Sequence, residues 1–416
     1  MCAHPVHKPD GMQNIKTRLV HEGEHGERRP GGIPTALPIY TSSTYIHPDT
    51  ASLDSAFNAR SGESQYVYAR FGNPNTAGLE AVMTAAEGGR GAVACSSGMS
   101  ALYLALLAAG TPRGSIEPHA RHILASQDLY GATHTLLRDF FSAQNVPVSY
   151  CDPTDLAALR SAVQSHEPDV VLIESMSNPL LRIADIQAIA EIVHQMDARL
   201  IVDATMTTPI LHQPLTQGAD IVVHSATKYL GGHADVTGGI VVAANGMMVD
   251  VAQRYARLLG TCLGPFEARL VSRGIKTLAL RVREQCVNAA QIAQRLSAQP
   301  GISSVIYPGL PTHPQHELAG RQFHGLYGAM ISFELRNADR QAVFRFMDNL
   351  KLILPATSLG DIYTLITYPA ISSHRDMSEE TRHTRGINDN LVRLSVGIED
   401  AGDIIADLDQ ALQNSY

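Results

Sequence analysis

Short apolar runs that end in polar turns alternate with helical patterns through much of this 416-residue chain. The runs are Gly91–Cys95, His122–Ala125, Asp169–Glu174, Arg199–Asp203 and Asp220–Val223, with a helical pattern at Asp185–His194. Continuous apolar runs predict strands that are buried on both faces, and their alternation with helices predicts a parallel sheet with helices on both sides. Because such sheets bind ligands at the carboxyl ends of their strands, the polar residues after each run are the functional candidates.

Lys228 stands just beyond the last of these runs, next to the hydroxyl residues Ser225 and Thr227. A lysine taken alone is most simply an exposed surface residue. At a strand end, partial burial would favour its neutral amine, a nucleophile that forms a Schiff base with an aldehyde. Asp203 ends the preceding strand, and pyridoxal phosphate needs such an acid against its pyridine nitrogen. Ser225 and Thr227 lie two residues apart, as a pair of phosphate-binding hydroxyls would.

A second phosphate-binding element is predicted where the strand Gly91–Cys95 leads through Ser96-Ser97-Gly98-Met99 into an apolar helix. The unpaired amides at the start of a helix point at a ligand, and the helix dipole favours negative charge there. The amides of Gly98 and Met99 are therefore the candidate phosphate donors. An N-cap serine at this point is compatible with the same role.

Composition excludes several other classes of protein. With 44% apolar and 17% charged residues the chain is an ordinary globular protein, and its net charge of −8 argues against nucleic-acid binding. No apolar run reaches the roughly 18 residues of a membrane span, and the first residues lack the apolar core of a secretion signal. An odd number of scattered cysteines without CxxC spacing indicates reduced thiols in a cytoplasmic protein: Cys2, Cys95, Cys151, Cys262 and Cys286. No metal is expected, because a proline-containing surface loop without acidic or cysteine partners explains His313, His316 and His324.

Asp203, the block from His224 to Tyr229 and the following Gly231-Gly232-His233 together resemble the signature of the Cys/Met-metabolism family of pyridoxal-phosphate enzymes. The resemblance extends from about Thr17 to the C-terminus. It implies pyridoxal 5′-phosphate (PLP) as cofactor and the α/β fold of PLP-dependent transferases, aspartate aminotransferase-like fold type I, with a large domain on a mainly parallel sheet and a smaller α+β C-terminal domain. A nicotinamide-binding fold lacks support, since no G-x-G-x-x-G follows a strand.

Residues 1–70 hold many turn formers and few periodic segments, so they are expected to pack on something else. In the resembled family such an arm reaches over a neighbouring subunit of a homotetramer, a dimer of dimers with shared active sites. Tyr68 and Arg70 resemble the Tyr-x-Arg motif that reaches the cofactor phosphate of the partner chain. The plain alternative for these two residues is a β-segment with an exposed arginine.

The pattern changes after residue 272, which divides a PLP-binding domain, 71–272, from a C-terminal domain, 273–416. Phe266–Leu278 and Glu284–Leu296 predict long helices joined through residues 273–277. Strands are predicted at Met330–Leu335 and Leu391–Gly397, with helices between them. This order is typical of an α+β domain on an antiparallel sheet.

Arg393 lies among apolar neighbours on one of these strands, where an unpaired arginine is costly, so it needs an anion. The resemblance makes this arginine the clamp for the substrate α-carboxylate, which suits guanidinium geometry. It also implies that Tyr130 stacks on the cofactor ring and acts as a general acid. Asn178 would bond the ring hydroxyl of the cofactor, and Ser358 would contact the substrate.

The resemblance implies PLP-dependent γ-elimination from a γ-substituted L-amino acid, methionine γ-lyase-like, with release of a 2-oxo acid and ammonia. Thr357 replaces the glutamate that cystathionine enzymes usually carry before Ser-Leu-Gly, which weakens cystathionine as substrate. Methionine γ-lyases share Ser-Leu-Gly-Asp, but they typically have a cysteine in place of Ala132 and a Lys-Asp pair in place of Ala256 and Arg257.

Four alternatives stay open on the sequence. One is a γ-replacement transferase of the cystathionine γ-synthase or O-acylhomoserine sulfhydrylase type, and another is a γ-lyase for an unusual leaving group such as that of canavanine. A third is a cystathionine γ-lyase. The fourth is a non-catalytic cofactor-binding protein, which the complete set of Tyr130, Asp203, Lys228 and Arg393 opposes.

Overall fold

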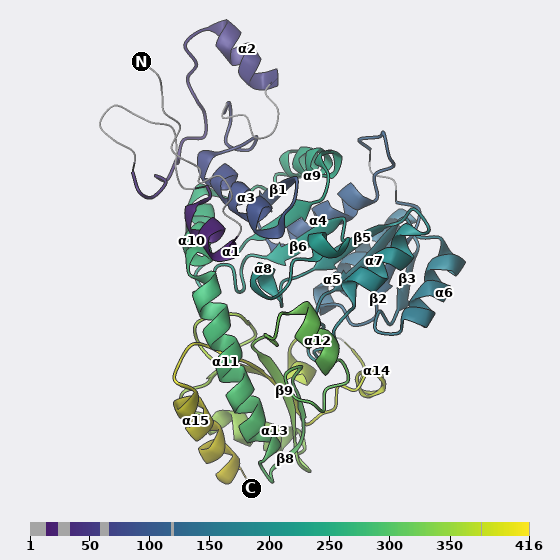
Figure 1. Ribbon diagram of the computed structural model, residues 1–416, viewed down its shortest axis with the longest axis vertical. Coiled ribbons are helices and arrows are strands. Elements are labelled where there is room, and N and C mark those ends of the chain that lie inside the picture. The colour runs from purple at the N-terminus through teal and green to yellow at the C-terminus, as the bar shows by residue number, and fades with distance from the viewer. Residues whose placement is uncertain (1–13, 24–33, 59–65, 118–119, 376, 416) are drawn as a thin grey trace.

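The computed structural model describes residues 14–23, 34–58, 66–117, 120–375 and 377–415, and it contains two sheets. Figure 1 shows the seven-stranded sheet in the upper half and the five-stranded sheet in the lower half, with the long helix α11 running from below α10 down the left side of the lower half. The strand order in the first sheet is β1-β7-β6-β5-β4-β2-β3. Its strands are β1 (Gly91–Cys95), β2 (Ile123–Ser126), β3 (Val148–Cys151), β4 (Val170–Glu174), β5 (Arg199–Asp203), β6 (Ile221–Ser225) and β7 (Gly239–Ala243).

The mainly parallel sheet predicted from the sequence is confirmed, with one strand reversed. β7 pairs antiparallel with both β1 and β6, whereas β2 to β6 pair in parallel. β7 returns after the turn that carries Lys228, and a chain that doubles back beside β6 must run against it. The register aligns the last residues of β4 and β5, so that Glu174 lies opposite Asp203.

Alternate side chains of the strands pack against helices on the two faces of this sheet. Along β4, Val170 and Leu172 lie in the cluster with α4 (Gly98–Ala109) and α9 (Gly246–Leu259). Val171 and Ile173 lie in the cluster with α6 (Leu156–His166) and α7 (Ile186–His194). This double burial explains why the strands read as unbroken apolar runs.

Among the remaining helices, α3 (Pro74–Glu87) packs its apolar side chains against β1 and β7. The others are α1 (Ile15–His21), α2 (Thr50–Asn58), α5 (Gly131–Leu136), α8 (Thr208–Leu211), α10 (Pro265–Lys276), α11 (Leu278–Ser297), α12 (His316–Gln322), α13 (Arg340–Asp348), α14 (Glu379–Thr384) and α15 (Ala401–Gln413). A π-helical turn spans Leu137–Phe141, and 3-10 turns span Ser142–Gln144, Pro214–Gln217 and Pro369–Ile371.

The helix predicted from Glu284 begins earlier, at Leu278, directly after α10. The reason is tertiary: Leu278, Ala279 and Val282 pack into the core beside the first sheet. The end of the same helix, including Ile292 and Leu296, packs into the core of the second sheet. Because α11 belongs to both cores, the domain division at residue 272 stays a prediction.

The second sheet has the order β10-β11-β12-β9-β8 and is antiparallel except between β10 and β11. Its strands are β8 (Ile302–Ile306), β9 (Met330–Leu335), β10 (Leu354–Pro355), β11 (Leu365–Thr367) and β12 (Leu391–Ser395). The strands predicted at Met330–Leu335 and from Leu391 are confirmed, and helices α11, α13 and α15 contribute to their core.

The N-terminal segment has little core of its own. Ile46 is fully exposed and Phe57 is 62% exposed, and α2 projects away from the two sheets in Figure 1. The segment is attached where Asn75 at the start of α3 bonds the backbone of Pro38 and Tyr40. Cys95, Cys151, Cys262 and Cys286 are free thiols, and Cys2 lies outside the described residues. Among the described residues no helix combines the length and apolarity that a membrane crossing requires.

Candidate active site

Lys228 lies in the turn after β6, where it meets a residue of the second half of the chain. Its Nζ donates a hydrogen bond to Ser358 Oγ at 3.1 Å. Burial lowers the pKa of the lysine, and the positive charge of Arg393 acts in the same direction. The site therefore favours the neutral, nucleophilic amine that the sequence predicts.

Asp203 ends β5 and is held by a residue that the sequence analysis did not select, Thr205. Asp203 Oδ1 accepts the backbone N–H of Thr205 at 2.9 Å, and Thr205 Oγ1 accepts the backbone N–H of Ser225 at 2.8 Å. Thr205 thus fixes the acid and one of the two hydroxyl residues relative to each other. Burial raises the pKa of Asp203, against the opposing effects of its Thr205 bonds and of His224. The sequence offers one signal for Thr205, because its hydroxyl follows the acid at the end of the strand by two residues.

Gly98 brings the start of α4 against the end of β6. A Cβ placed on Gly98 would lie 2.8 Å from Ser225 Cβ, so only glycine permits this approach. Ser97 caps the helix by accepting the N–H of Ser100, which leaves the Gly98 and Met99 amides at the helix start without an intrahelical partner. The helix start with the candidate phosphate-binding amides therefore lies against Ser225 at the end of β6.

Thr227 takes part in the turn beside this group. Its Oγ1 accepts the N–H of Gly238 at 3.1 Å, just before β7. The reversed strand therefore fixes the second hydroxyl residue after β6. The sequence alone placed Thr227 by its spacing from Ser225, and the structure supplies the bond that orients it.

Arg393 on β12 is buried, with only 3% of its surface exposed. Its Nη1 donates to Asn178 Oδ1 at 2.9 Å, and its Nη2 donates to the carbonyl of Ser358 at 2.9 Å. Its buried Nε has no hydrogen-bond partner among the described residues. Burial lowers the pKa of the guanidinium to about 10. A buried cation that keeps an unused donor is suited to bind an anion.

Tyr130 precedes α5 and has a half-exposed side chain, at 48%. Its backbone N–H donates to Glu174 Oε1 at 2.7 Å, which ties this loop to the end of β4. Burial raises the pKa of Glu174 well above its usual value, and the charge of Asp203 adds to this effect. The sequence analysis did not select Glu174, although a carboxylate at a strand end was a signal of the same kind as Asp203.

Tyr68 and Arg70 lie apart from this group of residues. Arg70 is exposed, donates from Nη1 to the carbonyl of Arg257 at 2.9 Å, and stacks over Phe71 at 4.8 Å. Tyr68 is 42% exposed. Within the described residues no hydrogen bond joins either side chain to Lys228 or to the other predicted cofactor contacts. Thr357 is exposed beside Ser358.

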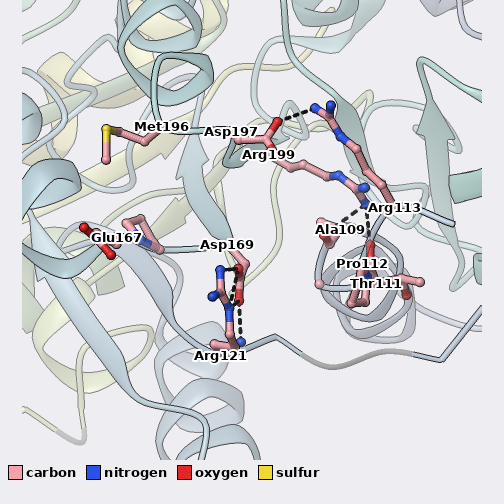
Figure 2. A pocket seen from close by; sticks show the side chains of 12 residues that line it. Ala109, Thr111, Pro112, Arg113, Arg121, Glu167, Asp169, Met196, Asp197 and Arg199 are labelled. Atoms are coloured by element: carbon pink, nitrogen blue, oxygen red, sulfur yellow. Dashed lines mark hydrogen bonds and ion pairs between the residues drawn. The ribbon is translucent and has the colours of Figure 1, made fainter. Parts of the chain in front are cut away.

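A cavity of about 470 Å³ lies at the other end of the parallel sheet, where β4 and β5 begin. Figure 2 shows its three arginines already engaged: Arg121 with Asp169 at 2.6 Å, Arg113 with Asp197 at 2.5 Å, and Arg199 with main-chain carbonyls at the end of α4. Since these cations are satisfied within the chain, this cavity does not compete with the carboxyl end as the catalytic site.

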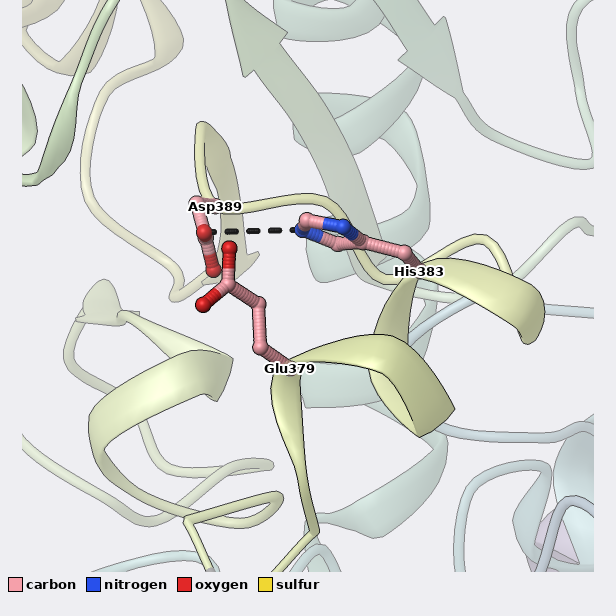
Figure 3. A group of neighbouring side chains, drawn as sticks. All are labelled: Glu379, His383 and Asp389. Carbon is pink, nitrogen blue, oxygen red and sulfur yellow. Dashed lines mark ion pairs between the residues drawn. The ribbon is translucent and has the colours of Figure 1, made fainter.

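Glu379, His383 and Asp389 place possible metal-ligand atoms within 4.8 Å of one another (Figure 3). Asp389 also accepts a hydrogen bond from Arg382 at 2.7 Å, so its charge is already balanced. The group is a solvated ion-pair cluster at the surface. Of the three histidines in the proline-containing loop, His313 is buried and accepts the N–H of Gln315.

Comparison with known proteins decides the family. The profile of the Cys/Met metabolism PLP-dependent enzymes matches residues 16–413. The chain belongs to this family. It is 38% identical to the cystathionine gamma-lyase of Bacillus subtilis over 96% of this chain and 99% of the relative. It is 39% identical to the O-succinylhomoserine sulfhydrylase of Pseudomonas aeruginosa over 95% of this chain and 92% of the relative.

Among solved structures, the cystathionine gamma synthase of Xanthomonas oryzae pv. oryzae, in complex with aminoacrylate and cysteine, superimposes with a TM-score of 0.87. That structure is 36% identical, and the match covers 97% of this chain and 98% of the other. These comparisons confirm the predicted fold, the PLP cofactor and the class of transsulfuration enzymes.

The residues at the carboxyl end of the sheet fit the cofactor of the family. The cradle at Gly98 and Ser225 suits a phosphate, the carboxyl of Asp203 suits a protonated ring nitrogen, and Lys228 is a suitable amine for the aldehyde. Arg393 would remain available for a substrate carboxylate.

Proposed function

We propose that this PLP-dependent enzyme catalyses γ-elimination from a γ-substituted L-amino acid, releasing a 2-oxo acid and ammonia. The observation that carries the proposal is the group of Lys228, Ser358 and Arg393. The lysine amine bonds the Ser358 hydroxyl, and the Ser358 carbonyl receives the buried guanidinium. Ser358 thus contacts both the Lys228 amine, which moves protons, and the Arg393 guanidinium, which binds the α-carboxylate.

Arg393 binds the substrate carboxylate in this proposal. The guanidinium is held from two sides by Asn178 and by the Ser358 carbonyl, so its plane is fixed before the substrate arrives. Its unpartnered Nε supplies a donor that nothing in the described chain uses. A fixed, planar donor set selects a carboxylate and orients the Cα–H bond relative to Lys228.

Lys228 carries the protons. Its lowered pKa favours a neutral amine, which would accept the α proton, pass it to the bound cofactor and, neutral again, accept a β proton of the substrate. PLP, when bound, supplies the electron sink that makes these protons acidic. Tyr130, whose side chain is half exposed, donates a proton to the departing γ substituent.

The relatives favour γ-replacement as the second candidate, since a sulfhydrylase and a synthase match about as well as a lyase. Elimination is preferred because Thr357 supplies no charge to hold a second amino-acid substrate. Purified enzyme should be incubated with methionine, cystathionine, canavanine and O-acyl-homoserines, with and without sulfide or cysteine. Production of 2-oxo acid and ammonia without added sulfide or cysteine supports elimination, whereas a γ-thiol amino acid formed only with sulfide, or a thioether formed only with cysteine, identifies a transferase.

We also propose a homotetramer whose active sites are shared between chains. Support comes from the exposed Tyr68 and Arg70, of which Arg70 bonds Arg257 on α9, and from the arm with little core of its own. Arg70→Ala and Lys228→Ala chains, each inactive alone, should regain part of the activity when mixed under subunit exchange, because one site of a hybrid pair keeps both native residues. Mixtures that stay inactive despite proven exchange would place the site within one chain.

A further inference from the structure

Glu174 and Asp203 form a pair of carboxyl groups that the reaction described above does not explain. They lie opposite each other in register at the ends of the parallel strands β4 and β5. Neighbouring strands are about 4.8 Å apart, and paired residues point to the same face. Two partly buried carboxyl groups on paired residues of neighbouring strands do not both ionise readily. One proton should therefore be held between them at neutral pH.

The contacts of the two groups differ, and the difference decides where the proton resides. Asp203 Oδ1 accepts the Thr205 N–H, and His224 favours the charged form of Asp203. Glu174 accepts one N–H, from Tyr130, and faces the negative charges of both Asp203 and Asp128. Asp128 is in turn paired with Arg182 at 3.2 Å.

We propose that Glu174 is a positioning residue that stays protonated in the working enzyme, anchors Tyr130 through its backbone N–H and leaves the negative charge of the pair on Asp203. The inference rests on the proposed roles of Asp203 and Tyr130, and not on whether the reaction is elimination or replacement. A neutral Glu174 keeps its carbonyl oxygen as acceptor for Tyr130. Asp203 then remains the single anion available to the pyridine nitrogen of PLP.

The direct test is the infrared spectrum of the full-length holoenzyme at neutral pH. Wild type minus Glu174→Gln should contain the carbonyl band of a protonated carboxylic acid. Glu191→Gln, at an exposed position on α7, is the matched control and should give no such band. Absence of the band in the Glu174 difference spectrum overturns the proposal. This measurement needs no substrate, so its outcome is separate from that of the proposed function.

Cofactor binding supplies the second readout. Glutamine keeps a neutral acceptor for Tyr130, so Glu174→Gln should bind PLP within about threefold of wild type, whereas Glu174→Ala should bind about tenfold more weakly, the equivalent of ~1.4 kcal/mol. If glutamine is as damaging as alanine, the charge of Glu174 is what matters and the proposal fails. If alanine is harmless, Glu174 has no positioning role.

The pH dependence of stability gives a third readout that a purely structural contact would not change. A carboxyl whose pKa is raised on folding stabilises the fold at low pH, and that contribution is lost as pH rises from its unfolded value toward its folded value. The Tm of Glu174→Gln relative to that of wild type should therefore rise as the pH is raised above about 4.3, the pKa of glutamate in the unfolded chain. If the Tm difference between Glu174→Gln and wild type does not change with pH, Glu174 is not protonated in the way proposed.

Discussion

The two ends of the seven-stranded sheet use the same residue types in opposite ways. At the amino end, Arg121 and Asp169 form an ion pair, and Arg199 donates to three carbonyls at the end of α4. At the carboxyl end, the buried Nε of Arg393 is a donor that no described residue uses. Charges that are balanced within the chain stabilise the fold, whereas unbalanced ones are held ready for a ligand.

The pKa values follow the same division. At the amino end burial pushes the pKa of Asp169 upward, but the bonds from Arg121 outweigh it and the pKa is lowered. At the carboxyl end burial raises the pKa of Asp203 and Glu174, and no arginine among the described residues opposes it. Carboxyl groups with raised pKa values and no arginine partner are the better marker of the catalytic end.

Replacing Lys228 should give the largest effect. Lys228→Ala should lower turnover by about 10³-fold or more, because the amine that moves the protons is removed. The wild-type protein as isolated should be yellow, and borohydride reduction with peptide mapping should locate the cofactor on Lys228. Lys351→Ala, at an exposed position, is the control and should retain activity. A cofactor label on any other lysine would contradict the assignment.

The next effect compares two buried arginines, Arg393 and Arg199. Arg393→Lys should lower kcat/KM about a hundredfold, or ~2.7 kcal/mol, since a lysine cannot present a planar donor pair to a carboxylate. Arg199→Lys should leave kcat/KM unchanged and lower the free energy of unfolding by about 1–2 kcal/mol, because carbonyl bonds at the end of α4 are lost. Steady-state kinetics and urea unfolding of both variants test this. Equal kinetic losses would remove the distinction between the two ends of the sheet.

Replacing Thr357 tests whether the catalytic end of the sheet also determines substrate specificity. Thr357→Glu adds a charge beside Ser358 that can pair with the distal ammonium of cystathionine. The ratio of kcat/KM for cystathionine to that for methionine should rise about tenfold, or ~1.4 kcal/mol. If wild type already prefers cystathionine to methionine, canavanine and the homoserine esters, Thr357 does not determine specificity, and the enzyme is a cystathionine enzyme.

The smallest effect is expected at the amino end. Arg121→Gln should lower the free energy of unfolding only slightly at neutral pH, because Arg121 is exposed and solvent screens the pair. A lowered carboxyl pKa gives stability above its unfolded value, and that stability is lost as pH falls through the folded value. The difference between variant and wild type should therefore vanish in acid, below the ordinary aspartate pKa of about 3.9, while activity at neutral pH is unchanged. A loss of turnover in Arg121→Gln would show that the amino end takes part in function.

The sequence by itself determined the features that depend on neighbours along the chain. The apolar runs became β1, β4, β5 and β6, since doubly buried strands need unbroken apolar residues. Lys228, Ser225 and Asp203 were selected because they follow such runs, where parallel strands bring their ends to one edge of the sheet.

Only the tertiary structure decided which of these residues meet and how their charges are balanced. Packing brings Arg393 to Asn178, Ser358 to Lys228, and Glu174 to both Asp203 and the Tyr130 amide. The reversed direction of β7 and the early start of α11 were decided in the same way. The physical reason is that register, burial and hydrogen-bond partners are set by contacts between segments far apart in the chain, which no local pattern encodes.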